Sequence, residues 1–151
     1  MSKVNDQKIL RSKEIGDFDH YFDGNDPGSI EAMQQTTKGG FDIAFEAVGS
    51  GEALNTCIEG VRPGGQVVMI GNSMEERVPF SLNRAVLREI RLTGSVSCTR
   101  KEFEETIDLI DSGMIDPEKY VTDVMPLEEL QHAFERLISP DDPVVKIVIK
   151  P

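Results

Sequence analysis

FDIAFEAVG, at residues 41–49, is the stretch that decides the fold of this 151-residue chain. Residues 41–48 are nearly continuous in apolar character, which is typical of a strand buried on both faces of a parallel sheet. Residues 49–51 then end the strand, and residues 52–62 repeat apolar side chains at helical spacing. The stretch therefore predicts a strand followed by a helix, the repeating unit of a parallel α/β sheet.

The same alternation continues on both sides of this stretch. Pro63, Gly64 and Gly65 predict a helix stop before the next strand. The predicted strands lie at residues 18–22, 66–70, 91–98 and 144–150, and the predicted helices at residues 7–15, 29–37, 82–90, 101–112 and 127–138. Ser29 is the predicted N-cap of its helix, and Gly113 a predicted helix terminator.

The bulk composition excludes several classes of protein. The formal charge of −11 would repel a phosphate backbone, so nucleic acid is not an expected partner. The apolar runs are too short to span a membrane, and the amino terminus has no apolar signal segment, so we expect a cytoplasmic protein. Cys57 and Cys98 belong to no metal-binding or disulfide pattern, and we expect both to be small buried apolar groups.

Ligands of open α/β sheets bind outside the carboxyl ends of the strands. In this chain those positions are residues 46–49, 70–72 and 94–96, and each group contains glycine. Gly49, Ser50 and Gly51 resemble the start of a phosphate-binding loop, but Leu54 stands where the third glycine belongs, so tight turns are the favoured interpretation. Glu46 is expected to accept hydrogen bonds from nearby backbone groups rather than to act as a catalyst.

The other polar residues carry no clear chemistry. His20 and His132 have no partner at a useful spacing, so both are interpreted as structural residues. The carboxylates at positions 102, 104, 105 and 108 lie on the polar side of a predicted helix, which indicates a solvated surface.

The order of the segments is more specific than any single motif. The opening stretch, VRPGGQVVMIG (61–71) and LREIRLTGS (87–95), followed by DLIDSGMIDP (108–117), MPLEELQHAF (125–134) and VKIVIKP (145–151), is similar to the medium-chain dehydrogenase/reductase family. The ending most resembles the sorbitol, butanediol and threonine dehydrogenase branch of zinc-containing alcohol dehydrogenases.

This resemblance implies hydride transfer between a small alcohol or carbonyl compound and NAD or NADP. It implies an α/β fold with a doubly wound, Rossmann-type parallel sheet in three αβα layers, here partial and lacking its first strands. Residues 1–143 would form the partial nucleotide-binding domain. Residues 144–151 would form a strand that returns to the catalytic domain, so we expect it to be exposed or to pair with another molecule. Zinc would belong to that absent domain, and the chain alone would be inactive.

The resemblance also assigns site residues. Lys3 falls where NAD-dependent members place a carboxylate and would suit the 2′-phosphate of NADP, although an artefact at the chain start explains it equally well. Lys8 falls beside the same ribose, and Lys146 at a position that reaches the pyrophosphate; an ordinary solvated lysine remains an equal alternative for both. The other implied cofactor contacts are Ala47, Val48, Ile70, Gly71, Ser95 and Val96.

Two alternatives from other classes remain open. Residues 41–68 also resemble the later half of methyltransferases that bind S-adenosylmethionine, although the segments from Leu87 onward match dehydrogenases. A non-enzymatic dimerisation module is the other, because family members pair through the edge strand that matches residues 91–98. An unpaired edge favours at least a homodimer in either case.

Overall fold

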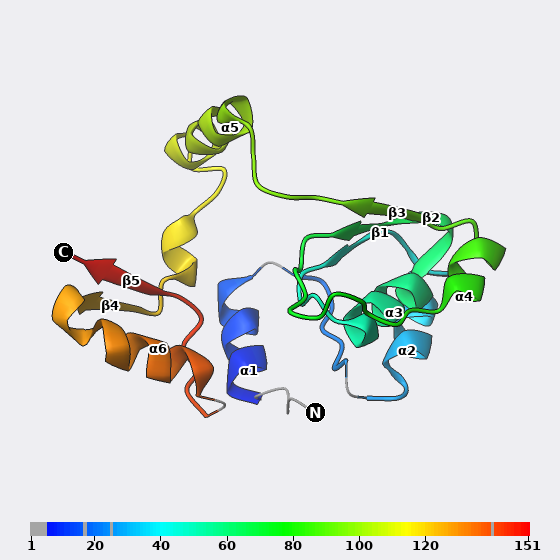
Figure 1. The fold of residues 1–151 in the computed structure, drawn as a ribbon, viewed down its shortest axis with the longest axis horizontal. Coiled ribbons are helices and arrows are strands. Elements are labelled where there is room, and N and C mark those ends of the chain that lie inside the picture. Colours follow the sequence, from blue (N-terminus) through cyan, green and yellow to red (C-terminus); the bar gives the residue numbers. More distant parts are fainter. Residues whose placement is uncertain (1–5, 17, 25, 140) are drawn as a thin grey trace. The chain divides into compact units, whose positions relative to one another are not determined.

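The computed structural model describes residues 6–16, 18–24, 26–139 and 141–151. The chain divides into two compact units (Figure 1). One comprises residues 22–97, and the other comprises residues 1–21 and 98–151. The domain boundary expected at residue 143 stays a prediction.

The 22–97 unit is built on a three-stranded parallel sheet in the order β1-β2-β3. Its strands are β1 (Phe41–Glu46), β2 (Val61–Met69) and β3 (Arg91–Gly94). Phe41 pairs with Val61, but Ile43 pairs with Gln66, so residues 62–65 bulge out of the ladder. The sheet confirms the predicted alternation, and β2 begins five residues earlier than expected because the Pro-Gly-Gly segment is accommodated as this bulge.

Three helices accompany this sheet and lie on the same side of it (Figure 1). They are α2 (Ser29–Thr36), α3 (Gly51–Gly60) and α4 (Leu82–Leu87). The buried core lies between α3 and the sheet, and it consists of Leu54, Ile58, Val61 and Val67. An amphipathic helix packing on parallel strands removes these side chains from water, which is the main stabilising effect here.

The opposite face of β1 corrects an expectation. We predicted a strand buried on both faces, but Ile43 and Phe45 are exposed, Phe45 at 65%. The helices of this unit cover one face, so the third layer expected from the resemblance is not part of it. The α/β class with parallel strands is confirmed, and the apolar run alone could not tell which face a helix would cover.

The helix α4 is a second correction. Its predicted apolar stripe is exposed at Leu82, Val86 and Leu87, and Ala85 is the buried residue instead. The helix has only six residues and ends near Arg88. Ala85 is its one buried residue. Ile90, the last member of the stripe, packs against the core from outside the helix.

The predicted strand at residues 18–22 is wrong, since all five residues are described and they form no strand. The aromatic residues of this segment suggested a strand, but their rings pack against other aromatic rings instead. The rings of Phe22 and Phe41 lie edge to face at 6.4 Å. The helix that follows, α2, packs on α3 and is supported there by a hydrogen bond from Gln34 Nε2 to the Glu59 carbonyl oxygen.

The predicted cap of α2 is also wrong. Gly28 is the N-cap, and no side chain caps the helix. The Ser29 hydroxyl is buried and donates to the carbonyl oxygen of Asp23 instead.

The other unit contains α1 (Asp6–Ile15), α5 (Arg100–Asp111) and α6 (Leu130–Ile138), with short 3₁₀ helices η1 (Pro117–Tyr120) and η2 (Leu127–Glu129). The helix α5 begins at a capping box formed by Thr99 and Glu102. Its amide at Gly113, which has a φ of +73°, bonds back to Ile110 and confirms the predicted terminator. The apolar stripe of α5 at residues 103, 107 and 110 is exposed.

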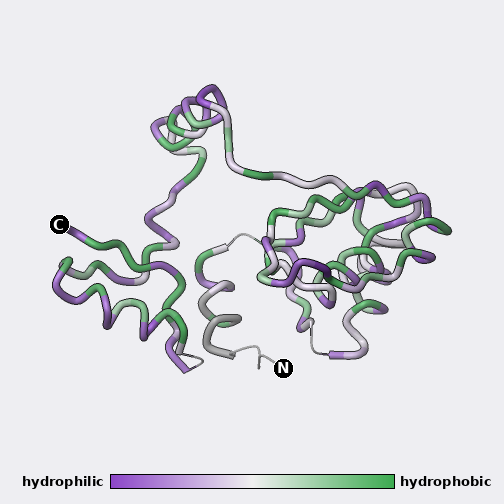
Figure 2. The backbone as a smooth tube through the Cα atoms, in the orientation of Figure 1, coloured by the Kyte–Doolittle hydropathy of each residue, from purple (hydrophilic) through white to green (hydrophobic). Residues whose placement is uncertain are grey.

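The terminal strand β5 (Ile147–Lys150) contradicts the expected exposed or intermolecular state. It pairs in parallel with β4 (Asp123–Pro126), a strand that we did not predict. β5 itself is largely hydrophobic (Figure 2), and Val144, which precedes it in the chain, is buried. The two strands and α6 form a β-α-β unit, so the strand at the end of the chain pairs with β4 of the same chain. No helix among residues 6–16, 18–24, 26–139 and 141–151 is long and apolar enough to cross a membrane.

Candidate functional site

The carboxyl ends of the three strands of the 22–97 unit meet at one edge of the sheet. Glu46 pairs with Met69, and Met69 pairs with Gly94. We call the residues that follow these strands, 47–49, 70–72 and 95–96, the carboxyl edge. This is the place where open parallel sheets bind their ligands.

Glu46 holds two segments of the carboxyl edge together. Its side chain is 4% exposed, and its Oε1 accepts hydrogen bonds from the amides of Val48 at 2.8 Å and Gly49 at 2.7 Å. Its backbone oxygen accepts from the amides of Ile70 and Gly71 at 2.7 and 2.9 Å. The predicted role of Glu46 as a backbone acceptor is confirmed, and burial without these donors would be costly.

Gly49 and Gly71 allow the two segments to approach each other. A Cβ atom on Gly71 would lie 2.2 Å from the Gly49 nitrogen, and one on Gly49 would lie 2.5 Å from the Asn72 oxygen. Gly49 also has a φ of +80°. Both glycines are therefore required by backbone contacts within the protein.

Six of the residues implied by the resemblance lie together on the carboxyl edge. The side chains of Val48, Ile70 and Val96 are 72%, 52% and 93% exposed. Ala47 and Ser95 are also exposed, and Gly71 is half-buried. The edge thus presents a row of apolar side chains next to strand-end peptide groups.

Of the three predicted lysines, the structure describes the side chain of Lys146 alone. Lys146 precedes β5 in the other unit, where its side chain is exposed and its carbonyl oxygen accepts from Thr122. Lys8 lies in α1, and its side chain falls outside the described residues, as does Lys3 entirely.

The loop at residues 49–51 favours the tight-turn interpretation over a phosphate site. The amide of Gly49 is bonded to Glu46, and the Ser50 hydroxyl accepts from Ala53 at 3.1 Å as the N-cap of α3. The Leu54 amide bonds to the Ser50 carbonyl oxygen. The amides of Gly49, Ala53 and Leu54 are therefore already used inside the protein.

The two cysteines differ from each other. Cys57 packs against the core, where burial and, secondarily, the charge of Glu46 raise the pKa of its thiol. Cys98 is exposed, so the expectation that both thiols are buried is wrong for Cys98. Cys98 follows the end of β3 at Gly94, so it is not part of a strand of the sheet.

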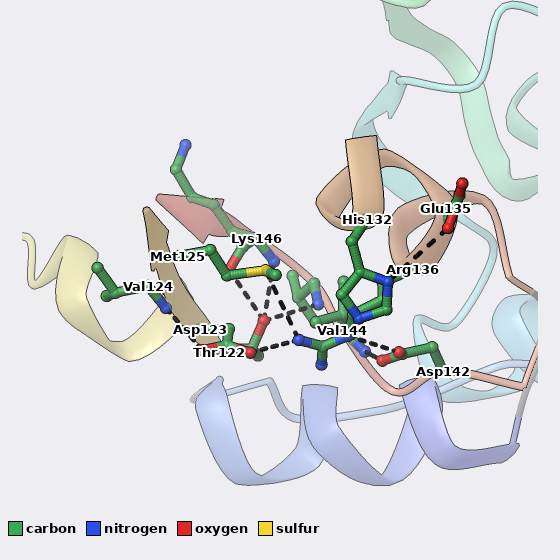
Figure 3. Close-up of polar contacts among 11 residues, drawn as sticks. Thr122, Asp123, Val124, Met125, His132, Glu135, Arg136, Asp142, Val144 and Lys146 are labelled. Atoms are coloured by element: carbon green, nitrogen blue, oxygen red, sulfur yellow. Dashed lines mark hydrogen bonds and ion pairs between the residues drawn. The ribbon is translucent and has the colours of Figure 1, made fainter. Parts of the chain in front are cut away.

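Sequence reasoning missed an ionic cluster in the other unit (Figure 3). Arg136 of α6 donates to Asp123 of β4 and, through Nε at 2.9 Å, to Asp142 before β5. These contacts, first those with Asp142, raise the pKa of Arg136, while Arg136 lowers the pKa of Asp123. Nearby, the Thr122 hydroxyl accepts from the amides of Val145 and Lys146. The cluster joins α6 to β4 and to the segment before β5 through residues 13 and 6 positions apart, and no helix or strand pattern predicts such contacts.

Histidine and carboxylate groups do not assemble into a metal site here. Across the described ranges, no group of three or more His, Cys, Asp or Glu residues could hold a metal ion. His132 lies 3.8 Å from Glu135 of the same helix and is exposed. The described residues therefore do not fit a zinc ion.

The carboxyl edge presents an apolar surface with open space beside it. Flat rings pack well against exposed apolar side chains, and Val48, Ile70 and Val96 supply them. A Cβ atom on Gly94 would meet nothing within 4 Å, so open space adjoins the end of β3. The edge can thus receive a ring and offer peptide groups to its polar substituent.

Comparisons with known proteins show the family of the chain. A family model described as zinc-binding dehydrogenase matches residues 1–112. The (R,R)-butanediol dehydrogenase of Neisseria gonorrhoeae is 27% identical over 143 residues, which are 93% of this chain and 40% of that protein. The sorbitol dehydrogenase of Bacillus subtilis is 26% identical over 152 residues, 98% of this chain and 42% of that protein.

Solved structures show the same similarity. The zinc-dependent alcohol dehydrogenase 2 from Streptococcus pneumonia has a TM-score of 0.86 at 26% identity, covering 97% of this chain and 42% of that one. The L-idonate 5-dehydrogenase from Escherichia coli has a TM-score of 0.79 at 25% identity, covering 97% and 41%. The chain spans about 40% of the first of the curated relatives that it matches. Because the family model covers residues 1–112 of 151, the chain belongs to the zinc-binding dehydrogenase family.

Proposed function

We propose that this chain is the nicotinamide-binding portion of a zinc-type alcohol or polyol dehydrogenase. The observation that carries the proposal is the carboxyl edge, where two loops tied together by Glu46 present Val48 and Ile70 beside the end of β3. The whole protein would transfer hydride between a small alcohol or carbonyl compound and NAD or NADP. Membership of the family supports this reaction over the methyltransferase alternative.

The cofactor would lie across the carboxyl edge. Ala47 and Val48 would contact its apolar parts, while Ile70, Gly71, Ser95 and Val96 would meet the nicotinamide carboxamide. The amides of Ile70, Gly71 and Ser95 already bond to Glu46 and Met69, so the carboxamide would donate to backbone carbonyl oxygens instead.

The lysines would serve the charged half of the cofactor. Lys8 would lie beside the adenosine ribose and Lys146 near the pyrophosphate, where a cation is attracted to phosphate oxygens. Lys3 would favour the 2′-phosphate of NADP over the free ribose of NAD. Zinc, held elsewhere in the longer family proteins, would polarise the substrate oxygen. We expect no turnover from this chain alone.

Titration of the chain with NADH and NADPH tests this proposal. In the family, much of the cofactor-binding surface belongs to parts of the protein that this chain does not match. We therefore expect a Kd no tighter than millimolar, roughly −4 kcal/mol. The backbone amide signals of Val48, Gly71 and Ser95 in NMR spectra should shift with saturation, and those of α6 should not. Micromolar binding, or no shift at the carboxyl edge, would contradict the proposed site.

We also propose that the chain pairs with a second copy through residues 91–98. In the described part of the chain, β3 is an edge strand of its sheet, and Val96 beyond it is exposed. Unpaired edge strands favour association with another strand. Sedimentation equilibrium should give twice the 16.7 kDa of the chain; the monomer mass at all concentrations would contradict this pairing.

A further inference from the structure

Glu46 places a buried carboxylate directly beneath the carboxyl edge. One of its oxygens, Oε1, lies in the turn of residues 48–49. The other, Oε2, lies 2.8 Å from the position that a Cβ atom on Gly71 would occupy. The carboxylate group therefore reaches from the end of β1 to the residue that follows β2 by two positions.

Within the described part of the chain, the hydrogen bonds of this carboxylate come from uncharged groups, which orient it without forming an ion pair. The hydrogen bonds recorded for its side chain come from the neutral backbone amides of Val48 and Gly49. Its influence extends to α3, where it adds to the burial that raises the pKa of Cys57. A carboxylate that is 4% exposed is screened by water far less than a surface carboxylate.

The two redox states of a nicotinamide cofactor differ by one charge in the ring. The oxidised ring carries a positive charge, the reduced ring is neutral, and the rest of the molecule is the same. We propose that Glu46 is a specificity-determining residue that favours the oxidised over the reduced nicotinamide, because its buried negative charge lies under the place where the ring binds. This inference rests on the proposed function.

Coulomb's law sets the size of the expected effect. For unit charges on the order of 10 Å apart at a partly solvated edge, the attraction changes a binding ratio by about three- to tenfold. A purely structural role of Glu46 would weaken both redox forms by the same factor. The ratio of the two dissociation constants therefore separates the electrostatic role from the structural one.

The test measures this ratio in the wild-type chain and in Glu46→Gln. The glutamine side chain keeps an Oε1 acceptor for Val48 and Gly49, removes the charge, and places an amide nitrogen where Oε2 lies beside Gly71. NAD⁺, NADH, NADP⁺ and NADPH are titrated separately, and Kd is read from the NMR shifts of the amides at Val48, Ile70 and Gly71. In Glu46→Gln we expect the oxidised-to-reduced Kd ratio to rise about three- to tenfold for both cofactor pairs.

A matched variant controls for net charge. Glu31→Gln removes one exposed carboxylate from α2 in the same unit and should leave the ratio unchanged. An unchanged ratio in Glu46→Gln, with binding retained at the edge, would overturn the inference alone. Loss of cooperative unfolding in Glu46→Gln would also overturn it, since the charge would then be needed for folding. Absence of edge shifts with every cofactor in the wild-type chain would overturn the proposed function and the inference together.

Discussion

Arg88 donates from Nη2 to the carbonyl oxygen of Val61 at 2.6 Å, which joins the residue after α4 to the first residue of β2. Its Nη1 also donates to the carbonyl oxygens of Ile58 and Glu59, both at 3.1 Å. The last carbonyl groups of a helix have no partner within it, and a cation there interacts favourably with the helix dipole. The Arg88 side chain thus supplies hydrogen-bond donors to the carbonyl groups at the C-terminal end of α3.

Replacing Arg88 should destabilise the 22–97 unit. Arg88→Met removes the arginine donor from the carbonyl oxygens of Ile58 and Val61, while the Glu59 oxygen keeps its bond from Gln34, and it should lower the free energy of unfolding by about 1–3 kcal/mol. Arg84→Met is the matched control, because the Arg84 side chain is exposed and loss of its ion pair with Glu59 should cost about 0–1 kcal/mol. Urea unfolding followed by circular dichroism measures both. Equal losses in the two variants would contradict the capping role of Arg88.

A side chain at Gly71 should disrupt the carboxyl edge. In Gly71→Ala the new Cβ would collide with the backbone of Gly49, so the two loops must separate, at a cost of about 2–4 kcal/mol. Gly94→Ala, where a Cβ meets open space, should change stability by less than about 0.5 kcal/mol. Thermal unfolding of the two variants compares them directly. A stable Gly71→Ala with unshifted Val48 and Gly49 amides would show that the loops are not in close contact.

The cap of α3 offers a third comparison. Ser50→Ala removes the acceptor for the Ala53 amide and should lower stability by about 1 kcal/mol. Ser81→Ala should have little effect, because Ser81 is the N-cap of α4 but makes no side-chain capping bond. Denaturant midpoints at constant m-value report the difference. A Ser81→Ala loss as large as that of Ser50→Ala would show that capping geometry does not distinguish the two helices.

The stability of the β4-α6-β5 unit should decrease in acid. The hydrogen bond from Arg136, and then that from the Val124 amide, holds the pKa of Asp123 below its usual range. The unfolded chain therefore takes up this proton at a higher pH than the folded chain. The resulting stabilisation is fully present above about pH 4 and is lost as the pH falls through the folded-state pKa.

Titration of the Asp123 carboxyl carbon by NMR measures this coupling. Arg136→Gln should move the pKa of Asp123 back toward its usual range, and Arg100→Gln, which removes an exposed pair with Glu104, should not. An Asp123 pKa that stays the same in Arg136→Gln would show that the cluster does not control it.

Apolar patterns in the sequence predicted the strands and the buried helix face correctly where neighbouring segments of the chain pack on each other. Residues 41–46 and 66–69 became adjacent parallel strands, and the Leu54 and Ile58 stripe became the buried face of α3. The backbone role of Glu46 was also predictable, because a carboxylate at the end of a buried strand has amides close by in the following turn.

The failures occurred where a partner distant in sequence decides the structure. The strand β4 is four residues long, includes Pro126 and depends on β5 more than 20 residues later, so it has no local signal. Residues 18–22 had the aromatic composition of a strand but no strand to pair with. Arg136 and Asp123 are likewise joined only by the crossover that brings α6 onto β4.

The central claim is that the nicotinamide ring binds at the carboxyl edge. Intermolecular nuclear Overhauser effects between the nicotinamide ring protons of millimolar NAD⁺ and the protein methyl groups test it most directly. We predict contacts from the ring to the methyl groups of Val48, Ile70 and Val96. Contacts from the adenine protons to these methyl groups, or ring contacts confined to β4, β5 and α6, would contradict it.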